Sequence, residues 1–437
     1  MQHDDHARPG RRQFLRLSTM GAAALPLLAT GCAKAADAGT AGAANGANKM
    51  PRSIAALQPV TGKAVPIGDA EYESRLAKAQ RLMGKHKLDA IFVAGGTSLD
   101  YFADVKWWLS ERTAGMILPR EGDPVYVFPT FERGRAEEQV RFGHDICTWQ
   151  ENESPYKTIA QILKDLHIAG GTLGIEERVP FFMADGIGQA AANINLVSAT
   201  PVTAGCRAFK SKAELALMQI ANDATLATYH AVWQALQPGM TEADVHALVQ
   251  AAYARQGVEG FASVNVGKYT ASPHGSREPQ EIREGTVVML DDGCKVEGYT
   301  SDITRTFVLG KASDKMKKVF AIIQQAQRAA REAARTGGVM QDIDAAARKV
   351  IVDAGYGPDY KYFTHRLGHG IGMDMHEWYY AVGGDTRTIA DRMTMSDEPG
   401  IYIPGEFGVR LEDCMYTTPD GGHWFTQPSP SIEHPFA

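Results

Sequence analysis

The sequence predicts an α/β domain followed by a larger α+β domain. Between residues 69 and 205, short apolar strands alternate with segments of helical periodicity, which is typical of an α/β fold. After residue 206, long helices are followed by short strands and turns that continue to the C-terminus, which is typical of an α+β fold. A chain of 437 residues is long enough for two such domains.

The first domain, expected over residues 69–205, contains apolar runs bounded by turn residues. Strands are expected at residues 89–93, 114–118, 125–128 and 172–175. Helices are expected at residues 72–87, 132–140, 156–166 and 181–192. Residues 119–124 combine two prolines with a glycine, so we expect a hairpin between the second and third strands.

The second domain, expected over residues 206–437, begins with a helix start signal. Ser211 followed by Glu214 forms a capping box, and Thr241 begins a second helix that ends near Gly257. Further strands are expected at residues 263–266, 287–290 and 303–309. Further helices are expected at residues 314–335 and 340–354.

The N-terminus has the composition of an export signal rather than of a fold. Arg11 and Arg12 precede Phe14-Leu15 and a short apolar run, the pattern of a twin-arginine signal, which we assign to residues 1–35. Cleavage would fall either at Gly31-Cys32, where a lipid anchor on Cys32 would follow, or after Ala33-Lys34-Ala35. Residues 36–68 are expected to be a flexible linker, and the protein is expected in the periplasm or cell envelope.

Composition excludes several classes of partner. The formal net charge is −6 and the chain has no long basic run, so nucleic acid is not expected as the main partner. The cysteines of the mature chain are widely spaced and form no Cys-x-x-Cys pair, which argues against a zinc knuckle and a dense disulfide framework.

One segment, from His365 to Glu377, combines three histidines with alternating glycines. Gly368, Gly370 and Gly372 would each cost a helix about 1 kcal/mol, so an extended segment that approaches other backbone closely is expected. In such a strand, His365 and His369 would lie on one face, because their separation is even.

Four acidic residues occur in strand-like settings where an exposed carboxylate is not expected. They are Asp291, Asp302, Glu398 and Glu412. Carboxylates gathered in a core repel one another unless cations lie between them. Together with one imidazole they exceed the ligand set of a tetrahedral zinc ion and suit two divalent ions about 3.5–4 Å apart. The oxygen-rich set favours Mn²⁺, with Co²⁺, Zn²⁺ or Fe²⁺ as alternatives.

Five motifs together resemble the pita-bread metallopeptidases (peptidase family M24). The motifs are Asp291-x-Gly293, Tyr299-Thr-Ser-Asp302-Ile-Thr-Arg-Thr-Phe307, Gly368-His-Gly-Ile-Gly-x-x-x-His376-Glu377, Glu398-Pro-Gly-Ile-Tyr402 and Val409-Arg-Leu-Glu-Asp413. The resemblance is strongest to the Xaa-Pro branch, which contains aminopeptidase P and prolidase. It implies a creatinase-like N-terminal domain and a pita-bread (creatinase/aminopeptidase) catalytic domain.

The resemblance also implies the roles of the metal ligands. Asp291 would bind one ion, Asp302 and Glu412 would bridge both, and His369 and Glu398 would complete the second. A water or hydroxide between the ions would be the nucleophile. Glu398 would also act as the general base.

Four further residues receive roles from the same resemblance. His274 would bind substrate, His376 would donate to the scissile carbonyl, and His365 would line the proline pocket. Arg410 would orient Glu412 or the substrate. The implied activity is hydrolysis of the Xaa-Pro bond at the N-terminus of peptides or in dipeptides, and the sequence leaves the choice between these two substrates open.

Three alternatives to a peptidase remain open from the sequence. The same site could act on a non-peptide amide or phosphoester, the chain could be a metal-free creatinase-like C–N hydrolase, or it could be a non-catalytic binding protein. The last two are disfavoured because the metal-ligand set is intact. A Cys294 nucleophile is disfavoured because no base stands at suitable spacing.

Neighbouring residues lead to further expectations. Asp292 and Asp397 are expected to face away from the metals, because adjacent residues in a strand face opposite ways. Trp107 and Trp108 are expected in the core, although in similar proteins aromatic residues of the first domain can reach the site of a neighbouring subunit. A homodimer or higher homo-oligomer is also expected.

Overall fold

The computed structural model describes residues 50–436. The expected export signal, Cys32 and the first part of the expected linker therefore lie outside the described residues. Within residues 50–436, no helix has the length and apolar character needed to cross a membrane.

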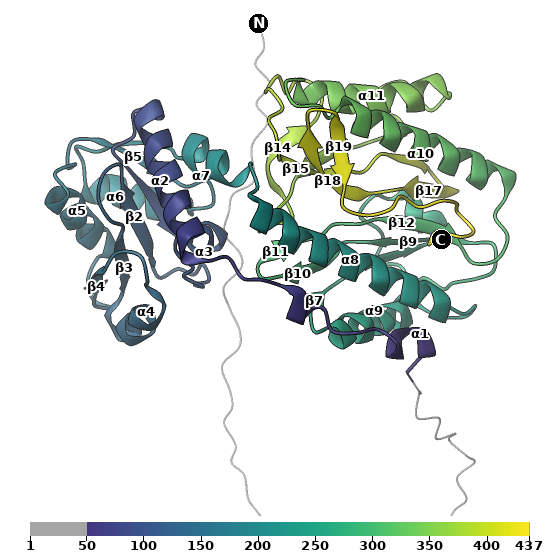
Figure 1. Ribbon diagram of the computed structural model, residues 1–437, viewed down its shortest axis with the longest axis horizontal. Coiled ribbons are helices and arrows are strands. Elements are labelled where there is room, and N and C mark those ends of the chain that lie inside the picture. Colours follow the sequence, from purple (N-terminus) through teal and green to yellow (C-terminus); the bar gives the residue numbers. More distant parts are fainter. Residues whose placement is uncertain (1–49, 437) are drawn as a thin grey trace, which may run out of the picture. The chain divides into compact units, whose positions relative to one another are not determined.

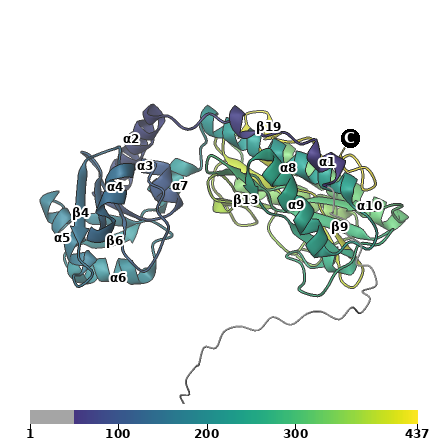
Figure 2. The same cartoon turned by 90° about the horizontal axis from the view of Figure 1, so that it is seen from below.

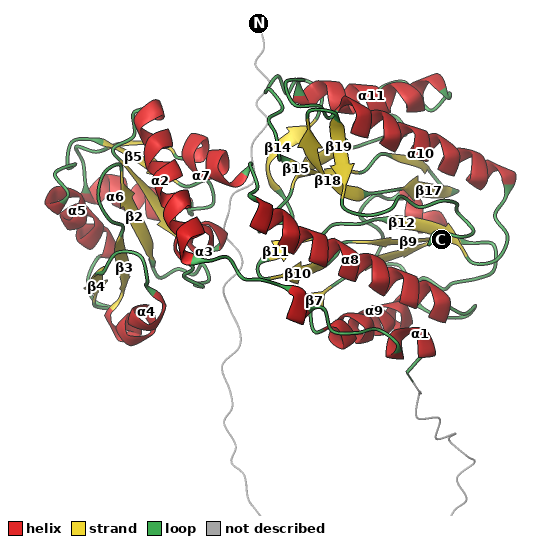
Figure 3. Ribbon diagram, viewed as in Figure 1, coloured by secondary structure: helices red, strands yellow, loops and turns green. Residues whose placement is uncertain are grey.

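The first domain is built on a six-stranded mixed sheet, as the alternation of strands and helices predicts (Figure 3). The strand order is β4-β3-β2-β1-β5-β6. The strands are β1 (Ala90–Ala94), β2 (Gly115–Pro119), β3 (Val125–Pro129), β4 (Asp145–Trp149), β5 (Thr172–Ile175) and β6 (Asn195–Ser198). The pairing of β2 with β3 is antiparallel, which confirms the expected hairpin.

Helices cover both faces of this sheet (Figure 1). They are α2 (Asp69–His86), α3 (Thr97–Ala103), α4 (Arg133–Gln139), α5 (Pro155–Asp165), α6 (Phe181–Ala190) and α7 (Thr200–Arg207). Side chains of α2, α3 and α7 share a core with Ile91 and Val93, whereas those of α5 and α6 pack with Ala90 and Phe92. Alternate residues of β1 thus face opposite layers.

The two adjacent tryptophans differ from one another. Trp107 is buried against Phe128, with ring centroids 4.5 Å apart, as expected for a core residue. Trp108 is 69% exposed, so the expectation that it belongs to the core is wrong. Its ring lies beside the guanidinium of Arg135 instead, at 4.5 Å.

The expected flexible linker over residues 36–68 is corrected for its second half. Residues 50–68 contain the helix α1 (Arg52–Ala55) and the 3₁₀ turn η1 (Thr61–Lys63). The side chain of Ile54 is fully buried, and the Ser53 hydroxyl donates to the carbonyl of Ala231, 2.7 Å away. Leu57, Val60, Ala64 and Ile67 pack, partly buried, against the same core, which compositional reasoning did not detect.

The catalytic domain contains two pairs of helices. They are α8 (Lys212–Ala235) with α9 (Glu242–Gln256), and α10 (Asp314–Ala333) with α11 (Met340–Asp353). The α1 segment lies beside α8 and α9 in both views (Figures 1 and 2). The capping box predicted at Ser211 is present, because Ser211 accepts from the backbone N–H of Glu214 at 3.1 Å while the Glu214 carboxylate accepts from Ser211 N–H.

The strands of the catalytic domain form four small sheets, with orders β11-β10-β7, β12-β9-β8, β14-β13-β15-β18-β19 and β16-β17. The first eight strands in chain order are β7 (Glu259–Gly260), β8 (Ser263–Val266), β9 (Val287–Asp291), β10 (Cys294–Val296), β11 (Tyr299–Thr300), β12 (Arg305–Val308), β13 (Gly368–Gly370) and β14 (Glu377–Ala381). The remaining five are β15 (Thr394–Asp397), β16 (Gly400–Ile403), β17 (Phe407–Arg410), β18 (Asp413–Thr418) and β19 (Gly421–Trp424).

The glycines around His369 allow the close backbone approach expected of them. A Cβ on Gly368 would overlap the carbonyl oxygen of Ser396, and one on Gly372 would lie 2.7 Å from a carboxylate oxygen of Glu377. The strand itself is shorter than expected: β13 begins at Gly368 and has a bulge after His369. His365 lies before this strand, so strand alternation does not explain its position.

Candidate active site

The five predicted metal ligands come from strand ends that the sheets bring together. Asp291 is the last residue of β9, and Asp302 lies shortly before β12, which pairs with β9. His369 is the central residue of β13, Glu398 follows β15, and Glu412 lies between β17 and β18. Because β13 and β18 both pair with β15, the pairing brings His369, Glu398 and Glu412 close together.

Ligand atoms from these side chains form groups of the size that holds a metal ion. Within each group, one atom per residue lies within 4.8 Å of the others. The groups are Asp291–Asp302–Glu412, His369–Glu398–Glu412 and Asp302–His369–His376. Asp302 and Glu412 are therefore common to an Asp291 side and a His369 side of one cluster.

Buried carboxylates in this cluster resist ionisation. Burial, followed by the charge of neighbouring carboxylates, raises the pKa of Asp302 and Glu412 well above the ordinary values. Burial also raises the pKa of Glu398, to about 7. The exception is Asp291, whose pKa is lowered because its ion pair with Arg410 and a hydrogen bond from Thr304 more than offset burial.

His369 presents a lone pair to two of these carboxylates. Its Nδ1 lies 3.1 Å from the carbonyl oxygen of Gly370, which accepts a hydrogen bond only if Nδ1 carries the proton. Its Nε2 lies 3.4 Å from an oxygen of Glu398 and 3.6 Å from one of Asp302. Burial lowers the pKa of His369 to about 3, so the ring is neutral near neutral pH. A lone pair facing carboxylate oxygens fits a cation between them.

Arg410 holds Asp291, which refines the role predicted for it. Its Nη2 forms an ion pair with Asp291, its Nε donates to the Thr304 hydroxyl at 2.9 Å, and its Nη1 donates to the Tyr402 hydroxyl at 3.0 Å. Among the described residues it has no hydrogen bond to Glu412, one of whose oxygens lies 2.7 Å from the Thr304 hydroxyl, whose single proton is shared between Asp291 and Glu412. Arg410 therefore orients one carboxylate directly and the other through a shared hydroxyl.

The cluster lies in a cavity of about 560 Å³ that also contains the other predicted site residues. His274, His365, His376 and Arg410 line this cavity with the five candidate ligands. The ring of His376 lies next to that of His369, with centroids 3.9 Å apart. Partial burial, with Arg366 and His274 nearby, lowers the pKa of His376, which favours a neutral imidazole.

His365 is fixed by two hydrogen bonds. Its Nδ1 lies 2.7 Å from the carbonyl oxygen of Arg366, so Nδ1 carries the proton and Nε2 accepts from the Tyr402 hydroxyl at 2.7 Å. Burial lowers its pKa to about 3. The residue therefore presents a neutral ring to the cavity, as a pocket for an apolar group requires.

Sequence reasoning missed three residues of this site. Thr304 links the carboxylates, Tyr402 links His365 to Arg410, and Arg366 lines the cavity. Thr304 and Tyr402 lie within motifs that had been recognised, so their presence in those motifs was the available signal. Arg366 lies next to His365, but nothing in its spacing indicates which way its side chain points.

The neighbouring residues follow the expectations in part. Asp397 faces away from the cavity, where one of its oxygens accepts from the indole N–H of Trp424 at 3.0 Å. Asp292 does line the cavity, but it belongs to none of the ligand groups, and its carboxylate accepts from the backbone N–H of Ser263 at 3.0 Å. Its φ of 92° marks the point where the chain leaves β9. Cys294 is buried with a raised pKa, which agrees with a structural role.

The fold and this arrangement define a pita-bread metallopeptidase with a creatinase-type first domain. Residues 216–419 match metallopeptidase family M24, and residues 75–209 match the creatinase/prolidase N-terminal domain. The chain belongs to metallopeptidase family M24.

Similar proteins are named as dipeptidases. The probable dipeptidase PepE of Mycobacterium tuberculosis is 34% identical over 363 residues, which cover 81% of this chain and 94% of that protein. The Xaa-Pro dipeptidase of Lactobacillus delbrueckii subsp. lactis is 31% identical, over 82% of this chain and 98% of its own. The crystal structure of dipeptidase PepE from Mycobacterium ulcerans superposes with a TM-score of 0.78 at 31% identity, covering 84% of this chain and 99% of that one. The chain is accordingly a metallopeptidase of the prolidase type.

The raised pKa values predict that stabilisation by metal depends on pH. In the folded protein the pKa of Glu398 is about 7, above its ordinary value of 4.5. Without cations, the contribution of the protonated Glu398 to the free energy of unfolding is therefore lost as the pH rises from about 4.5 to about 7. Bound cations require the ionised carboxylates. The increase in melting temperature caused by Mn²⁺ should therefore be larger at about pH 8 than at about pH 5.5.

Thermal unfolding with Mn²⁺ and with a chelator at both pH values measures this difference. The Glu406→Gln variant, which removes an exposed carboxylate paired with Lys315, should keep the same pH dependence. An equal increase in melting temperature at both pH values would contradict the assignment of these carboxylates as ligands.

Proposed function

We propose that the chain is an exported Xaa-Pro dipeptidase that uses two divalent cations. The observation that carries this proposal is the cluster of four carboxylates and one imidazole, which lies in a cavity walled by three further histidines. Asp291, Asp302 and Glu412 would hold one cation, and Asp302, His369, Glu398 and Glu412 the other. Mn²⁺ suits this oxygen-rich set best.

Bound divalent cations would polarise the scissile carbonyl and lower the pKa of the attacking water. The protein's own residues supply the proton transfers. Glu398 would accept the proton of the water and pass it to the leaving prolyl nitrogen. His376, as a neutral imidazole, donates its N–H to the oxygen of the scissile carbonyl.

The imide bond to proline explains the need for this arrangement. Proline has no N–H and a fixed ring, so a peptidase cannot hold this bond through the backbone donor that other bonds offer. His365, held neutral between the Arg366 carbonyl and Tyr402, gives the cavity an uncharged wall against which the ring could pack.

The proposed specificity for Xaa-Pro dipeptides is supported by the chemistry of this site and by the similarity to proteins named as Xaa-Pro dipeptidases. A metal-dependent Xaa-Pro dipeptidase should cleave Ala-Pro with Mn²⁺ and should lose that activity after chelation. Ala-Ala should be cleaved far more slowly, because it lacks the proline ring. Peptide hydrolysis followed by chromatography measures all three rates. Two bound cations per chain without cleavage of any peptide would move the substrate to a non-peptide amide or phosphoester.

Arg366 favours dipeptides over longer peptides. Arg366 is one of the residues that line the cavity, its guanidinium lies 4.0 Å from the centroid of the Tyr380 ring, and within residues 50–436 it forms no ion pair. A positive side chain in this position would bind the free carboxylate that follows proline in a dipeptide. A longer peptide carries no charge at that point.

The Arg366→Met variant tests this role. It should raise KM for Ala-Pro by about tenfold or more and should leave KM for the C-terminal amide Ala-Pro-NH₂ unchanged, since the amide has no carboxylate to lose. Arg366→Lys, which keeps the charge, should recover part of the difference. Equal changes for acid and amide would show that Arg366 does not bind the carboxylate.

Export is proposed from residues 11–30 alone. Replacing Arg11 and Arg12 with lysine should retain the full-length chain in the cytoplasm of a bacterium that has a twin-arginine pathway, because that pathway reads the arginine pair. Cell fractionation with immunoblotting measures the distribution. An unchanged envelope fraction for the double variant would refute this route.

A further inference from the structure

The turn that carries His376 is fixed more firmly than a surface loop requires. Residues 371–376 connect β13, which contains His369, to β14, which begins at Glu377. Within the turn, Gly372 N–H donates to the Asp374 carbonyl at 3.0 Å, and the Gly372 carbonyl accepts from the backbone N–H of Thr300 at 2.7 Å. The candidate ligand and His376 thus stand at the two ends of one constrained segment.

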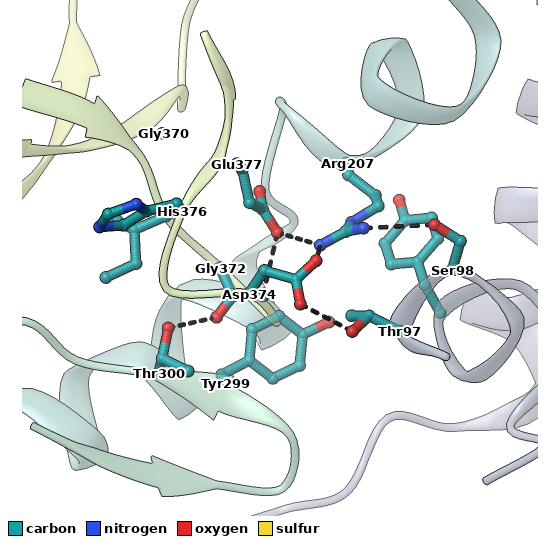
Figure 4. A network of polar contacts seen from close by, with 12 residues as sticks. Thr97, Ser98, Arg207, Tyr299, Thr300, Gly370, Gly372, Asp374, His376 and Glu377 are labelled. Atoms are coloured by element: carbon teal, nitrogen blue, oxygen red, sulfur yellow. Dashed lines mark hydrogen bonds and ion pairs between the residues drawn. The ribbon is translucent and has the colours of Figure 1, made fainter. Parts of the chain in front are cut away.

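The carboxylates of Asp374, in this turn, and of Glu377, directly after it, point away from the cavity and toward Arg207. One Nη of Arg207 lies 2.5 Å from an oxygen of Asp374 and 2.6 Å from an oxygen of Glu377. Figure 4 shows both carboxylates turned toward Arg207, while the imidazole of His376 extends to the other side. Lys210 pairs with the second oxygen of Glu377 at 2.6 Å, and the Thr97 hydroxyl donates to Asp374 at 2.7 Å.

This network is buried, which limits its contribution to stability. Arg207 and Lys210 are 3% and 2% exposed, so the desolvation of each charge offsets much of the attraction between them and the carboxylates. The contacts of the network nonetheless tie both carboxylates to Arg207, and that of Glu377 to Lys210 as well.

Arg178 extends the network to His376 itself. Its Nη2 donates to the backbone carbonyl of His376 at 3.2 Å, and its Nη1 pairs with Asp374 at 3.0 Å. The guanidinium also lies 5.2 Å from the centroid of the Trp378 ring. One side chain of the first domain therefore contacts residues on both sides of His376 and His376 itself.

We propose that Arg178 is a positioning residue that holds the backbone of His376 so that its imidazole meets the scissile carbonyl. The first domain thereby acts on the reaction although, among the described residues, none of its side chains lines the cavity. This inference rests on the proposed function, since it assigns Arg178 a task in cleavage of the Xaa-Pro bond. Arg207 anchors the same turn from its buried side.

The Arg178→Met variant removes the hydrogen bond to His376 and the ion pair with Asp374, and it leaves no unpaired buried charge, because Asp374 stays paired with Arg207. Its kcat for Ala-Pro should fall by roughly tenfold to a hundredfold, since small displacements of a group that contacts the transition state cost that much. KM should change by no more than about twofold. Arg178→Lys, which can restore one of the two contacts, should recover part of the loss.

A double variant that combines Arg178→Met with His376→Ala tests whether Arg178 acts through His376. If Arg178 acts through His376, adding Arg178→Met to His376→Ala should lower kcat no further. The matched control is Arg112→Met, an arginine of the first domain with 45% side-chain exposure and its own ion pairs, which should leave kcat unchanged. An additive loss in the double variant, or a higher KM at unchanged kcat, would overturn the proposal.

Hydrogen exchange provides a readout that needs neither activity nor bound metal. In chelated protein, Arg178→Met should speed exchange in peptides covering residues 371–377 and leave the rest of the catalytic domain as in the wild type. Unchanged exchange there would also overturn the proposal. If the wild type cleaves no Xaa-Pro bond, the proposed function fails, whereas this measurement still decides whether Arg178 holds the turn.

Discussion

Repulsion within the buried carboxylate cluster is the constraint on which the site depends. Arg410 relieves this repulsion for Asp291, but Asp302, Glu398 and Glu412 keep raised pKa values. Such a cluster is stable either with protons on several oxygens or with cations between them. The surrounding hydroxyls and backbone carbonyls orient the side chains without neutralising them, which leaves the charge to be balanced by the metals of a metallopeptidase.

The strand registers make the cluster sensitive to single-residue changes in position. Asp397 and Glu398 are adjacent, yet one accepts from Trp424 in the core and the other lines the cavity. A shift of β15 by one residue against β18 would exchange the two carboxylates. The absence of a side chain at Gly368, where a Cβ would overlap the Ser396 carbonyl, allows β13 and β15 to approach this closely.

Much of the fold and the cavity could be predicted because their signals are local. Capping at Ser211, the hairpin of β2 and β3, and the motif residues around His369 each occupy a short stretch of chain. The helix α3 and the strands β4 and β6 of the first domain were not predicted. The helix is short and the two strands are partly exposed, so their hydrophobic patterns are weak. Arg178 and Arg207 could not be assigned, because their roles depend on contacts with residues far along the chain.

The burial of Ile54 against the catalytic domain has a consequence for how the two domains are connected. Residues 52–55 pack on α8 and α9, and the chain then passes through the whole first domain before it reaches α8 itself. The first domain is therefore inserted between α1 and α8, both of which belong to the packed structure of the catalytic domain. A nascent chain must complete both α8 and α9 before α1 can make all of these contacts. For the same reason, a single cut of the chain between α1 and α8 cannot separate the first domain from a catalytic domain that keeps α1 on the same polypeptide.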